Sequence, residues 1–178
     1  MKILRKMLKK LIKEPKENFF SFIIKTLKPS KINNKLKSKL LKNMGSDIGD
    51  KVSISQGVWI DKPHNISIGD NVVLSRDVLI TSGGGVSIGK NSMIGYGTKI
   101  LSANHKIPEE RDKSVRFSGH IFKEVIIEDD VWIGCNCVIL PGVIIKKGSI
   151  VGAGSIVSKD LDEYGIYVGV PARRIKNR

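Results

Sequence analysis

Three histidines are the side chains of this sequence best suited to proton transfer near neutral pH. An imidazole with a pKa of about 6.5 can accept a proton from a hydroxyl group under these conditions. His105 lies in the segment SANHKIP, where a regular pattern of aliphatic residues stops. His64 lies in DKPHN and His120 in FSGHIF. All three are therefore available for proton transfer, and we expect His64 at the surface and His120 in a structural role.

Six-residue repeats are the elements that must position these histidines. An isoleucine, leucine or valine recurs with a period of six, with two extra residues after Ile60 and after Ile80 and a long break after Ile100. A fixed short period is typical of a solenoid, in which stacked coils bury a continuous aliphatic column. The anchors are Ile48, Ile54, Ile60, Ile68, Leu74, Ile80, Ile88, Ile94 and Ile100, then Ile127, Ile133, Ile139, Ile145, Val151 and Val157.

Glycine, asparagine or aspartate stands three residues after most anchors. These residue types best tolerate a positive φ, so each repeat is predicted to be a short strand followed by a tight corner. Three repeats then form one triangular coil. The predicted corner residues are Gly57, Asn71, Asp77, Gly83, Asn91, Gly97, Asp130, Asn136, Gly142, Gly148, Gly154 and Asp160.

Charge and pattern divide the chain into three regions. Residues 1–44 hold 14 Lys or Arg against two Glu, a net charge of +12 out of +14 for the whole chain. Residues 45–160 carry the repeats, and within them the charged segment 106–126 is predicted to leave the solenoid as a loop. Residues 161–178 form a C-terminal tail. Long excursions from a compact domain are usually functional.

The basic N-terminal arm has apolar residues at helical spacing, with lysines between them. Such helices either cap the open end of a solenoid or lie on an anionic membrane surface. No nucleic-acid-binding motif accompanies the charge, so we expect no nucleic-acid partner.

The cysteines and histidines indicate neither a disulfide nor a metal site. Cys137 occupies an inward position and Cys135 an outward one on the same strand, which excludes an unstrained bond between them. A zinc site needs about three imidazoles aimed at one point, and the three histidines show no such arrangement along the repeats. We expect a protein without a metal, located in the cytoplasm or at the inner face of its membrane.

The C-terminal part of the sequence resembles a known family. The segments VWIG, ILPGV, GAGSIVSKD and PARRIK are similar to the C-terminal signature of the hexapeptide-repeat acyltransferases. The resemblance implies an all-β fold, the left-handed parallel β-helix, which is an exception to the right-handed crossover rule. It also implies a homotrimer that binds acetyl-CoA, the acyl donor, between neighbouring subunits.

The same resemblance implies roles for individual residues. His105 matches the catalytic histidine, which would take the proton of a sugar hydroxyl as the oxygen attacks the thioester. Basic side chains would bind the phosphates of CoA. The positions that match cofactor-binding residues are Trp132, Gly134, Cys135, Ala153, Ser155, Ser158, Lys159, Arg173 and Arg174.

The residues at the positions expected to contact the acceptor differ from those of the galactoside and maltose acetyltransferases of this family. Where those relatives have an asparagine and an aspartate, this sequence has Ser75 and Gly83, and Arg76 could make a new polar contact. The basic arm and the VGVPARRIK tail are more similar to the O-acetyltransferases of bacterial capsule and lipopolysaccharide synthesis. The expected activity is therefore acetyl transfer from acetyl-CoA to a hydroxyl of a surface-polysaccharide sugar.

Three alternatives remain open at this point. The acceptor could be the amine of an amino sugar or nucleotide sugar, or it could be an antibiotic. A third alternative, without catalysis, is a trimeric scaffold that residues 1–44 hold on a membrane.

Overall fold

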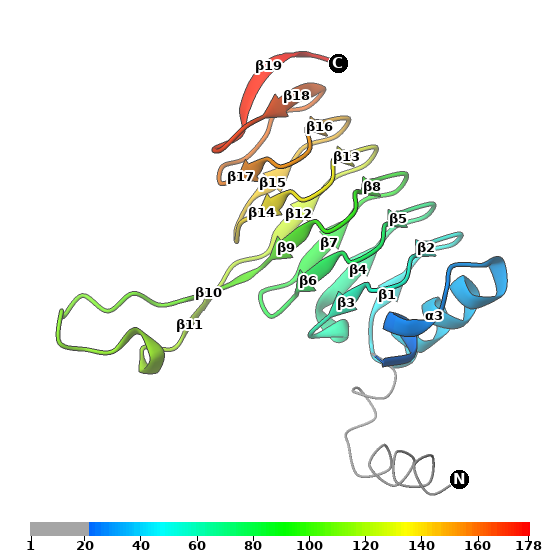
Figure 1. Ribbon diagram of the computed structural model, residues 1–178, viewed down its shortest axis with the longest axis horizontal. Coiled ribbons are helices and arrows are strands. Elements are labelled where there is room, and N and C mark those ends of the chain that lie inside the picture. The colour runs from blue at the N-terminus through cyan, green and yellow to red at the C-terminus, as the bar shows by residue number, and fades with distance from the viewer. Residues whose placement is uncertain (1–21) are drawn as a thin grey trace, which may run out of the picture.

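The protein is a triangular prism of stacked coils, which a computed structural model describes for residues 22–178 (Figure 1). The predicted all-β β-helix is confirmed. Its first sheet contains β1 (Asp47–Ile48), β4 (Ile66–Ile68), β7 (Val86–Ile88), β12 (Val125–Ile127) and β15 (Ile144–Ile145). The second contains β2 (Ser53–Ile54), β5 (Val73–Leu74), β8 (Met93–Ile94), β13 (Trp132–Ile133), β16 (Ile150–Val151), β18 (Gly165–Val168) and β19 (Arg173–Asn177). The third contains β3 (Trp59–Ile60), β6 (Leu79–Thr81), β9 (Lys99–Leu101), β14 (Val138–Ile139) and β17 (Ile156–Val157).

The coils stack in register, so each aliphatic anchor lies on the anchor of the next coil. On the second sheet, for example, Ile133 pairs with Ile94 on one side and Val151 on the other. All the predicted anchors are buried, with at most 5% of their surface exposed. Backbone N–H groups of one coil donate to carbonyl groups of the next. The core is therefore one continuous column that each coil shares with its neighbours.

Tight corners join the three sheets. We call the corner between the first and second sheets the first corner, that between the second and third the second corner, and that between the third and first the third corner. Most predicted corner residues have a positive φ, among them Asn71 and Asp77. Gly83 and Asp160 do not. The positive φ of the longer Gly83 corner falls on Gly85, and the Asp160 carboxylate fixes its own corner by accepting the Ile144 N–H at 2.8 Å.

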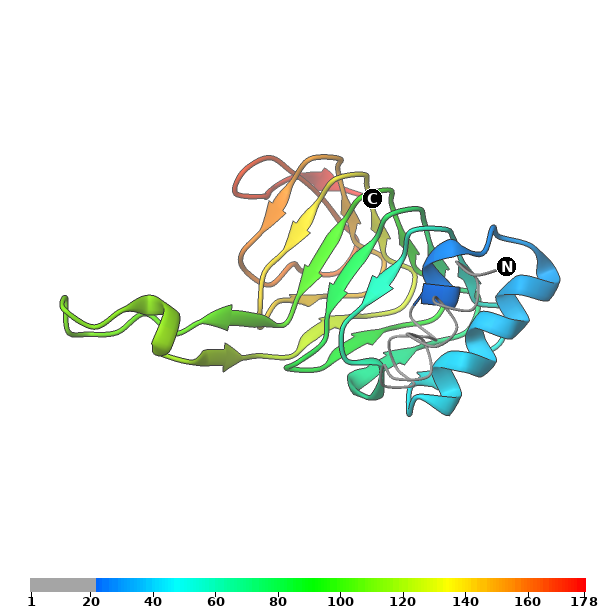
Figure 2. The same cartoon turned by 60° about the horizontal axis from the view of Figure 1, so that its bottom comes forward.

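The long excursion leaves the prism at the third corner as an antiparallel ribbon (Figures 1 and 2). The ribbon consists of β10 (Ala103–His105) and β11 (His120–Phe122), with the short 3₁₀ helix η2 (Val115–Phe117) near its tip. A second 3₁₀ helix, η1 (Pro63–Asn65), occupies the third corner of the first coil. The segment 106–126, predicted as a loop, thus contains β11, and its last residues belong to β12, where Val125 is buried.

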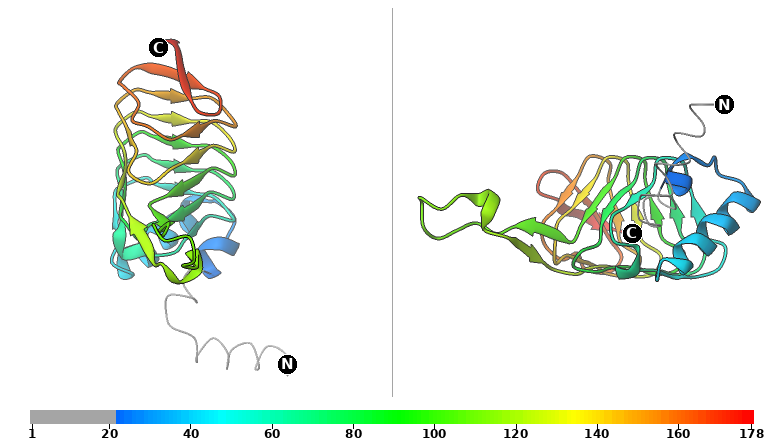
Figure 3. Two further views of the ribbon diagram at one scale, coloured as in Figure 1. Left: turned by 90° about the vertical axis from the view of Figure 1, so that its left-hand side faces the viewer. Right: turned by 90° about the horizontal axis from the view of Figure 1, so that it is seen from below.

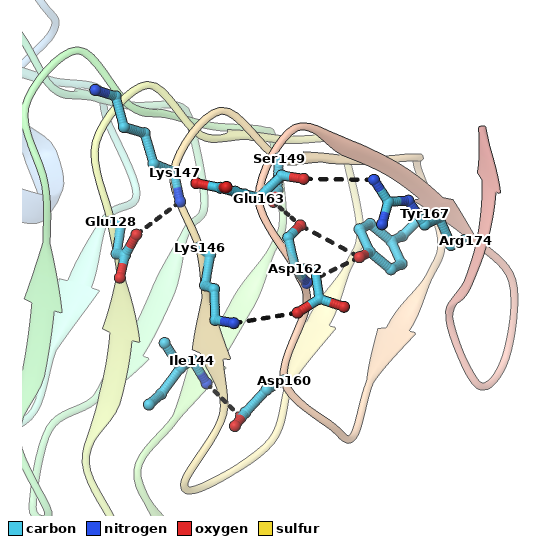
Figure 4. A network of polar contacts seen from close by, with 10 residues as sticks. All are labelled: Glu128, Ile144, Lys146, Lys147, Ser149, Asp160, Asp162, Glu163, Tyr167 and Arg174. Carbon is cyan, nitrogen blue, oxygen red and sulfur yellow. Dashed lines mark hydrogen bonds and ion pairs between the residues drawn. The ribbon is translucent and has the colours of Figure 1, made fainter. Parts of the chain in front are cut away.

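The C-terminal tail closes one end of the prism. The Tyr167 hydroxyl accepts a hydrogen bond from the N–H of Asp162 at 2.8 Å and lies 3.2 Å from the carbonyl of Asp162, to which it donates. Lys146 forms an ion pair with Asp162 at 3.1 Å (Figure 4). The ion pair ties the tail to the preceding coil, where β18 pairs with β16 and β19 pairs with β18.

Two helical segments close the other end (Figure 3). They are residues 22–26 and α3 (Lys31–Asn43). Leu40 and Leu41 of α3 and Ile24 of the shorter segment are buried against the first coil. The predicted helical residues before position 22 lie outside the described residues. No helix within residues 22–178 is long and apolar enough to cross a bilayer.

Lys37 supplies hydrogen bonds that the first coil would otherwise lack. In later coils a carbonyl at the end of a second-sheet strand accepts an N–H from the preceding coil, as Leu74 accepts from Ser55. The first coil has no preceding coil. The fully buried Lys37 ammonium instead donates to the carbonyls of Leu27, Ile54 and Ser55 at 2.8, 2.7 and 3.3 Å. Burial lowers the pKa of Lys37 to about 8.

Replacing Lys37 is expected to destabilise the protein. Lys37→Met removes the donor for three carbonyl groups and should lower the free energy of unfolding at pH 7 by about 1–3 kcal/mol. Urea denaturation measures the change. Lys35→Met, on the exposed side of α3, is the control and should change stability by less than about 0.5 kcal/mol. Equal losses in the two variants would contradict this role of Lys37.

Comparison of the native protein with Lys37→Met also tests the lowered pKa of Lys37. A lysine in the unfolded chain has a pKa of about 10.4. As the pH rises, Lys37 therefore loses its proton at a lower pH in the native state than in the unfolded state. The unfolded state then binds more protons. The stability of the native protein relative to Lys37→Met should therefore rise with pH above about 8.

Candidate active site

His105 ends β10 and faces His120 across the ribbon. The two residues pair in register, and their ring centroids are 4.6 Å apart. Both side chains are exposed to solvent. The two rings therefore pack on each other, and an exposed imidazole is a group that can take a proton from a hydroxyl. The structural role predicted for His120 did not include this pairing, because a six-residue period carries no information about an antiparallel ribbon.

Gly83 supports this histidine pair through Phe122. The Phe122 ring stacks on His120 with centroids 6.0 Å apart. The same ring also lies against Gly83, where an added Cβ would come within 2.8 Å of Phe122 Cε1. Contacts therefore run from Gly83 through Phe122 and His120 to His105. Gly83, predicted to contact the acceptor, therefore lies against the aromatic ring that packs on His120.

The outer part of the ribbon forms an open hollow whose lining begins at Lys106, the residue after His105. Its volume is about 540 Å³. Within it Lys113 and Glu110 form an ion pair at 2.6 Å, which lowers the pKa of Glu110. The lining combines polar and charged groups with one aromatic ring, and it consists of Lys106, Pro108, Glu109, Glu110, Lys113, Ser114, Phe117 and Ser118.

Many of the other predicted site residues lie along the second corner. Backbone hydrogen bonds stack this corner from coil to coil: Gly97 donates to Arg76 at 3.0 Å, and Gly154 donates to Cys135 at 2.8 Å. The predicted residues on this corner are Ser75, Arg76, Gly134, Cys135, Ala153 and Ser155, with Trp132 on the adjacent strand β13.

Small residues give the second corner a smooth edge. A Cβ on Gly134 would lie 2.6 Å from the backbone nitrogen of Ala153, so only glycine allows this close stacking. Cys135 is half-buried, Ala153 is exposed, and the Trp132 side chain is 50% exposed beside them. Ser155 differs, because it is fully buried and its hydroxyl accepts the Gly169 N–H at 3.0 Å. Its hydroxyl therefore anchors the tail and does not face a ligand.

The tail brings two arginines to the end of this edge. Residues 169–172 run beside Ile156, which donates to Gly169 and accepts from Ala172. Arg173 and Arg174 follow in β19, and both are exposed. The Arg174 guanidinium donates to the Asn177 side chain at 2.7 Å. It also donates to the Glu163 carbonyl at 3.5 Å (Figure 4). These contacts hold the second arginine while leaving it at the surface.

The structure separates the remaining predicted residues from that edge. Ser158 and Lys159 are exposed at the third corner, in the same corner column as Gly83 and the ribbon. Within one chain, the third sheet lies between the two corners. His64 is exposed in η1, as predicted. Residues 22–178 contain no group of three His, Cys, Asp or Glu side chains placed to hold a metal ion.

Similar proteins identify the family of this chain. Residues 124–159 match the family described as bacterial transferase hexapeptide (six repeats). A mutant of AntD, an N-acyltransferase from Bacillus cereus in complex with dTDP and coenzyme A, is 31% identical, with a TM-score of 0.58 over 79% of this chain and 89% of that one. The chain belongs to the hexapeptide-repeat transferases.

Two further proteins similar to this chain are acetyltransferases. A hexapeptide-repeat acetyltransferase from Vibrio cholerae, complexed with acetyl-CoA, is 28% identical, with a TM-score of 0.79 over 90% of this chain and 84% of that one. A galactoside O-acetyltransferase from Lactococcus lactis is 38% identical over 80 residues, 44% of this chain. That match spans 37% of the relative, so this chain covers well under half of its length.

A bulkier residue at position 83 should disturb both histidines. Gly83→Val is expected to displace Phe122 and shift the imidazole NMR resonances of His105 and His120, because the added side chain overlaps the ring. Ser87→Val, on the outer face of the first sheet, is the control and should leave both resonances in place. Unchanged resonances in Gly83→Val would show that the contact with Phe122 does not orient the histidines.

Proposed function

We propose that this transferase moves an acetyl group from acetyl-CoA to a sugar hydroxyl, with His105 as the general base. The exposed His105, paired with His120 at the base of a ribbon, is the observation that carries the proposal. The β-helix that bears it resembles one crystallised with acetyl-CoA.

The second corner fits the acyl donor. Its small residues, Gly134, Cys135 and Ala153, leave a smooth edge along which an extended pantetheine chain can lie, beside Trp132. Exposed arginines at the end of this edge suit phosphate groups, because guanidinium forms charge-assisted hydrogen bonds with them. When bound, acetyl-CoA supplies the activated acyl group.

His105 supplies the base that the acceptor needs. A hydroxyl is a poor nucleophile near pH 7 until a neighbouring group takes its proton. The His105 imidazole accepts this proton as the oxygen attacks the thioester carbonyl, and it returns the proton to the CoA sulfur as the C–S bond breaks. The His120 ring packs beside it, with ring centroids 4.6 Å apart. The hollow of about 540 Å³ beyond the histidines, with its carboxylates and ammonium groups, suits a polar acceptor of sugar size.

We further propose that the protein acts as a homotrimer. The base and the smooth edge occupy different corners of one chain, so a second copy is needed to bring them together. The ribbon projects away from the prism (Figure 2) and exposes large apolar side chains that a neighbouring copy would cover. These are Ile107, Val115, Phe117, Ile121 and Phe122.

The acceptor class has two candidates. The galactoside O-acetyltransferase supports a hydroxyl acceptor, and the resemblance of the tail to capsule and lipopolysaccharide enzymes supports a surface-polysaccharide sugar. The AntD structure, an N-acyltransferase bound to dTDP, supports an amine on a nucleotide-linked sugar as the second candidate.

Thiol release from acetyl-CoA tests the activity and the acceptor together. Over a panel of hydroxyl and amino sugars, free and nucleotide-linked, His105→Ala should lower kcat by about 10²-fold or more, the scale of a lost general base. His64→Ala, an exposed histidine away from the ribbon, is the control and should keep full activity. Equal rates in native protein and His105→Ala would refute the role of His105. Release with amines alone would favour the second candidate.

A further inference from the structure

The cap over the first coil carries a lysine face that the proposed transfer reaction does not use. Residues 22–44 contain seven lysines and no aspartate or glutamate. Four of these lysines recur at spacings of four, four and three residues, which places them on one side of α3. All four are exposed: Lys31, Lys35, Lys39 and Lys42.

These lysines line an open groove between α3 and the first corner of the first coil. The groove has a volume of about 860 Å³, and Lys51 lines its opposite side. Among the described residues, its lining contains five lysines and one carboxylate, that of Asp50. None of the five forms an ion pair with a described residue. We call Lys31, Lys35, Lys39, Lys42 and Lys51 the lysine groove.

Apolar side chains accompany the lysines on the same helix. Ile32, which also lines the groove, is 80% exposed, and Leu36 is 42% exposed one turn further along α3. The opposite side of α3 carries Leu40 and Leu41, which pack against the first coil. Packing among residues 22–178 therefore explains the buried side of the helix, and none of these residues covers its cationic and apolar outer side.

We propose that the lysine groove, together with Ile32 and Leu36, is a docking surface for an anionic lipid bilayer. Lysines attract anionic headgroups, and neighbouring apolar side chains insert at the boundary with the acyl chains. Because α3 lies at the end of the prism (Figure 3), a flat surface can approach it without meeting the ribbon or the tail. The cytoplasmic leaflet carries the negative surface potential that such a surface recognises.

The composition of this surface favours lipid over nucleic acid. Binding to nucleic acid strands commonly combines basic groups with aromatic side chains that stack on bases. The groove carries Ile32 among its lysines and no aromatic side chain in its described lining. The proposal concerns attachment to a membrane and does not depend on the transfer reaction.

Vesicle flotation of the full chain tests the proposal. The native protein should float with phosphatidylcholine vesicles that contain phosphatidylserine, and not with phosphatidylcholine alone. A groove variant replaces four lysines by glutamine, which keeps the helix propensity of these exposed positions. Its matched control loses the same charge from the prism. The groove variant is Lys31→Gln, Lys35→Gln, Lys39→Gln and Lys42→Gln, and the control is Lys62→Gln, Lys90→Gln, Lys123→Gln and Lys147→Gln.

The expected result is a loss confined to the groove variant. Each lysine near an anionic surface contributes roughly fivefold in affinity. The affinity of the groove variant for anionic vesicles should therefore fall by about a hundredfold or more. Added salt should weaken binding of the native protein. All three proteins retain residues 1–21, so a contribution from that segment is common to them.

Several outcomes would overturn the proposal. They are equal flotation of the groove variant and the control, equal binding to neutral and anionic vesicles, no flotation of the native protein, or groove-dependent binding to duplex DNA in place of vesicles. Thermal unfolding establishes that both variants are folded. Thiol release with soluble acceptors, measured without vesicles, separates a failure of docking from a failure of the transfer reaction.

Discussion

Hydrogen bonding between successive coils is the constraint on which the rest of this structure depends. Each strand contains only two or three residues in most of the prism, so no coil can satisfy its backbone or bury its aliphatic anchor alone. An interior coil has neighbours on both sides. The end coils do not, and the chain closes them differently. At the first coil, α3 covers the open end and its buried Lys37 ammonium supplies the missing donors. At the last coil, the C-terminal tail covers the open end, and the Tyr167 hydroxyl accepts a hydrogen bond from the N–H of Asp162.

The same constraint confines functional features to the corners. An insertion within a strand would break the register of every later coil, whereas an insertion at a corner leaves the stack intact. The ribbon leaves at the third corner, and β12 then resumes pairing with β7 in register. Small corner residues such as Gly134 allow close stacking and create the smooth edge of the second corner. The base and the edge therefore lie on different corners, which is why the proposed site requires two copies of the chain.

The sequence predicts the repetitive part of this architecture well and its exceptions poorly. The period of six identified the anchors and most corners, because burial and a positive φ restrict residue type at those positions. The break in the period located His105. The pairing of His105 with His120 depends on local antiparallel hydrogen bonds that have no period. In the sequence, Lys37 cannot be distinguished from the other lysines of the basic arm. Its burial is explained by the first coil, which has no preceding coil to donate to its carbonyl groups. The site residues are divided between two corners because of the way the coils stack. A single sequence motif carries no information about this stacking.

Complementation between two inactive variants tests most directly whether two copies share the site. One variant carries His105→Ala, and the other carries Arg173→Glu with Arg174→Glu. Each alone should be nearly inactive in thiol release from acetyl-CoA. If neighbouring copies supply the base and the arginines, coexpression at equal amounts creates sites with both sets intact, and activity should recover to about a quarter of the native value, the random fraction of such pairings. A mixture no more active than its two parents would contradict the shared site.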